Sequence, residues 1–204
     1  MQRTLANTEA TPCTSDGKIA KLRSFIEGME AVLQTSRDAI ETMNGVSTLL
    51  SKLIANDDWL PAPFAMPHPE FYQQYLLHAD PAGRFSVVSF VWGPGQKTPV
   101  HDHCVWGVIG MLRGGEVSQG FRIIDGSLRP NASLERLAQG DTARVSPETG
   151  DIHQVANAFA DRVSISIHVY GTDIGQQRRH LFDPATGAAK DFISGYSNMP
   201  RSDG

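Results

Sequence analysis

The stretch that decides the fold is "TPVHDHCVWGVIGMLRGG" (residues 98–115), where two histidines stand two residues apart before an apolar run. Alternate residues of a strand point to one face, so a strand here would present His101 and His103 together. Alone, such a pair is more often an ordinary surface or hydrogen-bonded pair. A third histidine, His153, follows the turn sequence "SPETG" and begins another apolar stretch. Three imidazoles from two strands can form one side of a metal site and leave positions open for reactants.

The second half of the chain consists of short apolar stretches separated by glycine, proline and aspartate. They predict strands at residues 85–92, 99–112, 116–124, 133–137, 142–145, 152–157 and 162–171. Many short strands at near-regular spacing are typical of a sandwich, jelly roll or barrel. Before them, helical apolar spacing begins at Ile19, Asn44-Gly45 is expected to end that helix, and a shorter stripe covers residues 46–54. The pattern predicts an all-β barrel with helices on its outside.

The chain has 204 residues, enough for one well-packed domain. Residues 1–17 lack periodicity and are predicted to be a flexible tail. Residues 18–204 are predicted to form one domain, with helices at about 19–56, the barrel at about 84–171 and a C-terminal extension at 172–204.

Composition excludes several classes of partner. A net charge of −4 without basic clusters argues against nucleic acid, and no apolar run is long enough to cross a membrane. Two cysteines and no signal peptide favour the cytoplasm. An anionic substrate would need a locally placed arginine, because the overall field does not attract it. No pattern indicates the oligomeric state.

Two spaced motifs surround the three histidines. The first has Gly95, His101, His103, Gly107 and Gly114; the second has Gly140, Pro147, Gly150, His153 and Asn157. Both resemble the paired motifs of the cupin superfamily, with glycine in place of the usual glutamate at Gly107 and one extra residue between Pro147 and Gly150. The resemblance implies a cupin barrel, a double-stranded β-helix or jelly roll, with an N-terminal helical layer. It also implies that His101, His103 and His153 bind a metal.

A site of three neutral histidines without a carboxylate resembles that of the thiol dioxygenases, the cysteine dioxygenase family. This resemblance implies one Fe(II) per chain as the cofactor, and a small thiol carboxylate and O2 as the reaction partners. Both oxygen atoms would be added to sulfur, giving a sulfinic acid. From the residues alone, zinc or copper would suit three histidines equally well.

The stretch "RVSISIHVYG" (residues 162–171) alternates between apolar and polar residues. Alone, this pattern indicates a half-buried strand. Within the thiol dioxygenase resemblance, Ser166, His168 and Tyr170 match a hydrogen-bonded triad beside the iron. Ser166 would hold His168, and His168 would orient the Tyr170 hydroxyl toward the metal and its reactants.

Two positions differ from mammalian cysteine dioxygenase. Trp106-Gly107 stands where that enzyme carries a cysteine crosslinked to the tyrosine. Cys104 is expected on the strand face opposite the histidines, so no Cys–Tyr crosslink is expected. Gln74 aligns with the arginine that clamps the substrate carboxylate, and a glutamine offers no charged fork.

These differences resemble the bacterial Gln-type branch, 3-mercaptopropionate dioxygenase. In that branch an arginine after the tyrosine contacts the carboxylate, which implies that role for Arg179 in "GTDIGQQRRHLF". Arg178 is the alternative, and an exposed arginine pair is the ordinary interpretation.

The predicted reaction converts 3-mercaptopropionate to 3-sulfinopropionate. Cysteine is the alternative substrate within the class, followed by mercaptosuccinate or cysteamine. Outside the class, the alternatives are a zinc- or manganese-dependent cupin isomerase and a non-catalytic ligand-binding cupin. The first normally retains the glutamate that Gly107 replaces, and the second needs no polar relay.

Overall fold

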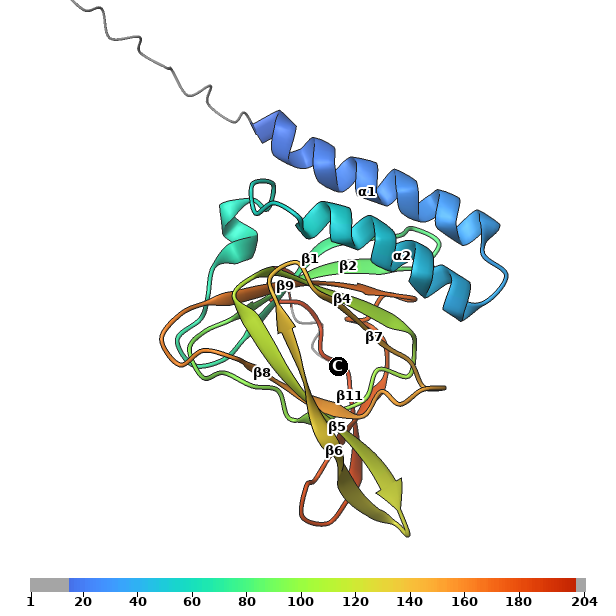
Figure 1. The fold of residues 1–204 in the computed structure, drawn as a ribbon, viewed down its shortest axis with the longest axis vertical. Coiled ribbons are helices and arrows are strands. Elements are labelled where there is room, and N and C mark those ends of the chain that lie inside the picture. Colours follow the sequence, from blue (N-terminus) through green and yellow to red (C-terminus); the bar gives the residue numbers. More distant parts are fainter. Residues whose placement is uncertain (1–14, 201–204) are drawn as a thin grey trace, which may run out of the picture.

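The computed structural model describes residues 15–200. Two helices, α1 (Ser15–Thr35) and α2 (Ala39–Ile54), form a layer over one sheet, and a short 3-10 helix, η1 (Ala62–Ala65), follows them (Figure 1). Most of the tail predicted at residues 1–17 lies outside the described residues. Helix α1 already begins at Ser15, before the predicted start at Ile19. None of the described helices has the length and apolar character needed to cross a membrane.

The break between the two helices lies earlier than predicted. Helix α2 begins after Asp38, whose carboxylate accepts a hydrogen bond from the Glu41 backbone N–H and caps the helix. The prediction that Asn44-Gly45 ends a helix is wrong, because both residues lie within α2. A Cβ at Gly45 would lie 2.8 Å from Val32 Cγ1 of α1. This glycine therefore allows the helices to pack closely rather than ending one of them.

The described strands form two sheets. One has the order β1 (Gln73–Ala79), β2 (Ser86–Trp92), β9 (Ser164–Tyr170), β4 (Gly107–Arg113), β7 (Thr142–Val145). The other has the order β11 (Ala189–Phe192), β10 (Arg179–Phe182), β3 (Val100–His101), β8 (His153–Asn157), β5 (Gly115–Ile124), β6 (Ser127–Ala138). Neighbouring strands are antiparallel, and strands distant in sequence, such as β2 and β9, lie side by side. This is the predicted double-stranded β-helix with an N-terminal helical layer.

Strand β9 separates the apolar core from the barrel interior. Ile165, Ile167 and Val169 join a core cluster with Leu50 and Ile54 of α2, on the sheet face that the helices cover (Figure 1). The intervening residues of β9 point into the barrel. The apolar face predicted for this strand therefore packs against the helices, as expected.

The single strand predicted at residues 99–112 is wrong. Strand β3 contains only Val100–His101, β4 begins at Gly107, and a loop lies between them. In this loop Cys104 has a positive φ of 56°, and Asp151 Oδ2 accepts hydrogen bonds from the backbone N–H groups of His103 and Cys104, each at 3.0 Å. Strands β1, β10 and β11 were not predicted.

Candidate active site

Three histidines meet at one end of β3 and β8. His101 and His153 lie opposite one another in the strand register, and His103 reaches them from the loop after β3 rather than from the strand. Their ring centroids are 4.8–5.0 Å apart. One ring nitrogen of each lies within 4.8 Å of the others. The structure thus brings together the three predicted ligands.

The environment of these rings fits a divalent transition metal. His101 Nδ1 lies 3.1 Å from the Pro99 carbonyl oxygen, which only accepts, so Nδ1 carries the hydrogen and the Nε2 lone pair is free. His153 Nδ1 lies 3.1 Å from Ser118 Oγ. His103 Nδ1 is buried and has no hydrogen-bond partner within the described part of the chain. Burial lowers the pKa of all three rings, for His101 to about 4. The rings are therefore neutral at pH 7 and can offer a nitrogen lone pair to a metal.

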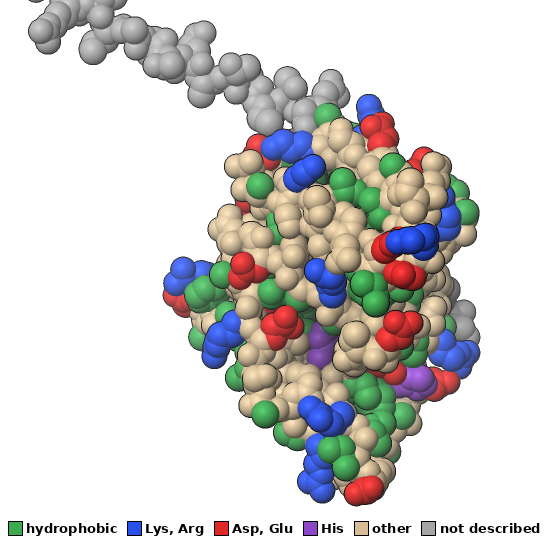
Figure 2. Space-filling model, turned by 45° about the vertical axis from the view of Figure 1, so that its right-hand side comes forward, with side chains coloured by type: hydrophobic (Ala, Val, Ile, Leu, Met, Phe, Trp, Pro, Cys, Tyr) green, Lys and Arg blue, Asp and Glu red, His purple; other side chains and the backbone are tan. Residues whose placement is uncertain are grey.

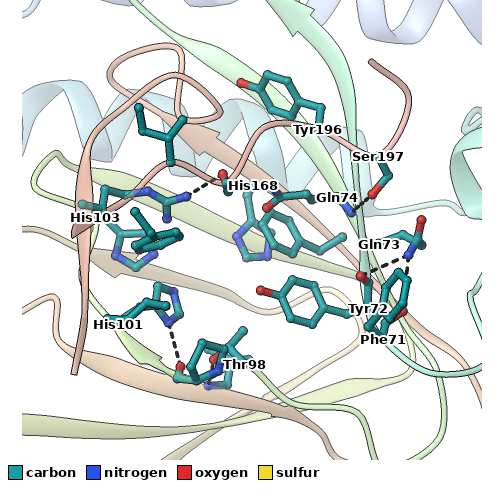
Figure 3. Close-up of a pocket in the computed structure, with 18 of the residues that line it drawn as sticks. Phe71, Tyr72, Gln73, Gln74, Thr98, His101, His103, His168, Tyr196 and Ser197 are labelled. Atoms are coloured by element: carbon teal, nitrogen blue, oxygen red, sulfur yellow. Dashed lines mark hydrogen bonds between the residues drawn. The ribbon is translucent and has the colours of Figure 1, made fainter. Parts of the chain in front are cut away.

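A cavity of about 530 Å³ adjoins the three histidines, a size typical of small-molecule sites. Its walls include Tyr72, Phe90 and Trp92, whose rings stack on one another. Figure 3 shows Tyr72 facing His101 and His103 across this space. In the space-filling view of Figure 2, a histidine is visible at the bottom of a hollow, and charged side chains of both signs are interspersed around it.

Ser166, His168 and Tyr170 form a line of hydrogen bonds along the inner face of β9. Ser166 Oγ lies 2.8 Å from His168 Nε2, and His168 Nδ1 lies 2.9 Å from the Tyr170 hydroxyl. All three side chains are buried. Burial lowers the pKa of His168 to about 3 and raises that of Tyr170, so both are neutral at pH 7. His168 and Tyr170 also line the cavity.

Gly107, at the position where the cupin motif has glutamate, packs against this line. A Cβ at Gly107 would lie 2.8 Å from Cδ1 and Cε1 of Tyr170, closer than side-chain carbons approach. The tyrosine ring therefore occupies the space that a glutamate side chain would need.

Glu116 extends the line beyond Ser166, and the sequence interpretation missed it. Its Oε1 accepts a hydrogen bond from Ser166 Oγ, and Trp92 Nε1 donates to the same oxygen of Ser166 at 3.1 Å. Glu116 is 3% exposed, and burial raises its pKa to about 7. The available signal was alternation: Glu116 and Ser118 share the inward face of β5, and Ser118 contacts His153.

The two neighbouring arginines lie in different environments. Arg179 is 5% exposed and lines the cavity; its Nη2 donates to Ser194 Oγ at 2.7 Å, and its guanidinium lies 4.6 Å from the Phe192 ring centroid. Its Nε is buried without a hydrogen-bond partner, and it forms no ion pair with any described residue. Arg178 is exposed and pairs with Asp191 at 3.0 Å. Only Arg179 faces the cavity.

Gln74 lines the cavity and holds the C-terminal wall, residues 192–199. Its Nε2 donates to the Gly195 carbonyl at 2.5 Å, and its backbone exchanges hydrogen bonds with Ser197 (Figure 3). In the β1–β2 pairing it lies opposite Phe90, a cavity residue. Its neighbour Gln73 lies opposite Val91 and also lines the cavity. The side-chain N–H of Gln74 is thus engaged by the wall that carries Ser194.

Cys104 lies away from this line of side chains. It is exposed, its Sγ is 3.8 Å from His180 Nδ1, and partial burial raises its pKa to about 11. Tyr170 is buried at the cavity. The expectation that Cys104 lies on a strand face was wrong, because it belongs to the loop. That it forms no crosslink with Tyr170 stays a prediction.

Similar solved structures include an uncharacterised conserved protein with a double-stranded β-helix domain from Klebsiella pneumoniae, with a TM-score of 0.43 and 18% identity over 65% of this chain and 91% of that one. A cupin superfamily protein from Desulfitobacterium hafniense has a TM-score of 0.42 and 14% identity over 58% and 95% of the two chains.

The family model for cysteine dioxygenase type I matches residues 14–182, which include the three histidines, Glu116, the β9 line and Arg179. This match covers most of the chain and confirms the predicted cupin thiol dioxygenase family, a family of non-haem metal enzymes. The chain belongs to the cysteine dioxygenase type I family.

Proposed function

We propose that this protein oxidises a small thiol carboxylate, with 3-mercaptopropionate as the best substrate, to the corresponding sulfinic acid, using one Fe(II) held by His101, His103 and His153. When bound, the iron would supply a centre at which the thiol and O2 meet and react. The single observation that carries the choice of substrate is the buried Arg179, which faces the same cavity as the three histidines.

Arg179 has the properties of a carboxylate-binding group. A buried guanidinium without a counter-ion is costly, and a substrate carboxylate would offset that cost by two charge-assisted hydrogen bonds. Ser194 and the Phe192 ring hold the guanidinium in place, so little side-chain freedom would be lost on binding. Arg179 thus binds and orients the substrate in this proposal.

The cavity offers less to the amine of cysteine. None of the described residues that line it is an aspartate or glutamate, so a substrate ammonium group would meet no opposite charge. 3-Mercaptopropionate carries only the thiol and the carboxylate, which match the histidine cluster and Arg179. Cysteine, mercaptosuccinate and cysteamine are the weaker candidates on this ground.

The remaining groups orient and protect the reactants. Tyr170, held by His168 and Ser166, places a hydroxyl beside the cavity, where it can donate a hydrogen bond to a developing negative charge. The stacked rings of Tyr72, Phe90 and Trp92 exclude water from one wall. Gln74 acts through the wall that it holds.

The test is oxygen consumption by the iron-loaded chain with each of the four thiols, and identification of the product by mass spectrometry. We expect one O2 per thiol, a sulfinate product and the highest kcat/KM for 3-mercaptopropionate. A preference for cysteine would overturn the substrate assignment without affecting membership of the family. Thiol binding without oxygen consumption would favour the ligand-binding cupin, and conversion of a non-thiol substrate without O2 would favour the isomerase.

A further inference from the structure

The line of hydrogen bonds on β9 ends in a buried acid that the proposed mechanism does not use. Glu116 lies on β5, in the opposite sheet, and reaches across the barrel to Ser166. The order of contacts is Glu116, Ser166, His168 and Tyr170, which ends at the cavity. Protonation of the acid at one end can therefore affect the hydroxyl at the other.

Ser166 fixes how hydrogens can be arranged in this line. Its hydroxyl has one hydrogen to donate and two lone pairs that accept. The Trp92 indole N–H only donates, so it occupies one lone pair at 3.1 Å. One hydrogen and one lone pair remain for Glu116 and His168. Whichever of them receives the hydrogen of Ser166, the other must donate to Ser166.

When Glu116 is ionised, it only accepts, so Ser166 donates to it. His168 must then donate to Ser166 through Nε2–H. Because His168 is neutral, its Nδ1 carries no hydrogen and accepts from the Tyr170 hydroxyl. In this state the hydrogen of Tyr170 points to His168, and only its lone pairs face the cavity.

When Glu116 is protonated, it donates to Ser166, and Ser166 donates to His168 Nε2. The hydrogen of His168 then lies on Nδ1 and is donated to the oxygen of Tyr170. The Tyr170 hydrogen is released and can be donated into the cavity. Every contact of the line is satisfied in both states, so neither leaves an unpaired buried group.

We propose that Glu116 is a positioning residue whose protonation reverses the hydrogen bonds from Ser166 to Tyr170, so that Tyr170 donates into the cavity only when Glu116 is protonated. The reversal follows from the contacts alone. Its consequence for turnover rests on the proposed function, because only there does Tyr170 act on a thiol and O2.

The surroundings of Glu116 place this change near neutral pH. The residues directly opposite it, Leu137 of β6 and Asn157 of β8, are uncharged, and β2 contributes only the Trp92 N–H. The titratable groups that face it are His168 and Tyr170 of β9, both neutral. Burial raises the pKa of Glu116 to about 7 because no cation among the described residues lies nearby and the hydrogen bonds from Ser166 and Trp92, which lower it, have the smaller effect.

The direct test reads the hydrogen on His168 in the full, metal-free chain labelled with 15N-histidine. The signals are assigned by comparison with a His168→Asn chain. Between pH 5.5 and pH 8.5 we expect the hydrogen of His168 to move from Nδ1 to Nε2, and we expect no such change in Glu116→Gln. The wild-type titration needs no variant to fold. If wild-type His168 keeps one tautomer over this range, the proposal is overturned.

The functional test compares pH profiles of oxygen consumption by iron-loaded wild type, Glu116→Gln and Glu135→Gln, an exposed acid on β6. We expect the ratio of kcat/KM for Glu116→Gln to that of wild type to rise roughly 25-fold from pH 6.5 to pH 8.5, while the Glu135→Gln ratio stays constant. Ionisation of the thiol substrate affects wild type and variant equally, so it does not change this ratio. A constant Glu116→Gln ratio overturns the proposed effect on turnover. If none of the thiols supports oxygen consumption, the proposed function is wrong, but the 15N result is unaffected.

Discussion

The adjacent residues Arg178 and Arg179 lie in different environments. One forms an exposed ion pair with Asp191, and the other is a buried cation at the cavity. The sequence assigned the carboxylate contact to Arg179 and kept Arg178 as the alternative, because strand alternation was not visible in the short β10. The structure separates them by burial.

We predict that Arg179→Ala raises KM for 3-mercaptopropionate strongly and that Arg178→Ala changes it little. Loss of a charge-assisted hydrogen bond costs about 1.5–3 kcal/mol, which corresponds to roughly 10- to 150-fold in kcat/KM. Steady-state oxygen consumption on both variants measures the difference. An effect of Arg178→Ala as large as that of Arg179→Ala would contradict the assignment.

Glu116 should make stability depend on pH. Its pKa is about 7 in the folded chain and near the usual 4.5 when unfolded, so the unfolded chain releases the proton first. The free energy of unfolding therefore falls as pH rises from about 4.5 to 7, by roughly 3 kcal/mol in total. Urea unfolding at pH 5 and pH 8 should show Glu116→Gln gaining stability over wild type at the higher pH. The exposed Glu135→Gln serves as control, and an equal pH response of Glu116→Gln and wild type would refute the raised pKa.

The sequence predicted the inward face of β9 because a strand repeats every two residues. It predicted the three histidines from their spacing in the two motifs, although His103 reaches the site from a loop rather than from a strand. It did not predict Glu116 as part of the same site. Alternation shows which residues of a strand point inward, but not which inward residues of the two sheets meet across the barrel. That pairing depends on how the sheets pack, which no local pattern contains.

At the scale of elements, strands β1, β10 and β11 were the hardest to predict. All seven residues of β1 are of intermediate burial, so its sequence "QQYLLHA" shows no alternation. Strands β10 and β11 have only four residues each, and their burial does not alternate as it does in the equally short β7, which was predicted. Strands β2 and β9 were predicted well because all of their residues are buried, whereas the central strand β3 was wrongly joined to β4.

The Gln74 and Gln73 pair tests the role of the C-terminal wall. We predict that Gln74→Ala raises KM for the thiol carboxylate, because the wall that carries Ser194 loses a side-chain hydrogen bond. Gln73 also lines the cavity, but its Nε2 donates to the neighbouring Phe71 and Tyr72 carbonyls and not to the wall, so Gln73→Ala should raise KM less. Hydrogen exchange of residues 192–199 should rise only in Gln74→Ala. Unchanged exchange there would exclude the holding role.

The helix pair makes a second prediction at this scale. Alanine is normally favoured over glycine within a helix by about 1 kcal/mol, but at Gly45 its methyl would collide with Val32. We expect Gly45→Ala to destabilise wild type by roughly 1–3 kcal/mol and to stabilise the Val32→Ala chain. Urea unfolding of the four chains gives the coupling between the two sites. A gain of stability in both backgrounds would show that the helices do not pack closely at this glycine.

For the whole molecule, the histidine cluster joins β3, β8 and the loop between β3 and β4, so a bound metal should link them. We predict that chelation lowers Tm, because a ligand that binds only the folded chain stabilises it. His153→Ala should lose both the metal and this response. His180→Ala, in the separate cluster of Asp102, Cys104 and His180, should keep both. Differential scanning calorimetry with metal analysis measures them, and full metal content in His153→Ala would exclude the three-histidine site.

The close contact of Gly107 with the Tyr170 ring has a consequence for how this barrel can vary. One volume beside the histidines can hold either an acidic fourth ligand or the phenol, because a side chain at position 107 and the ring overlap. An anionic ligand would lower the net charge of the centre, whereas the phenol contributes a neutral proton donor. A single Cβ thus couples two properties that would otherwise vary separately, the charge around the metal and the acidity available to its substrates.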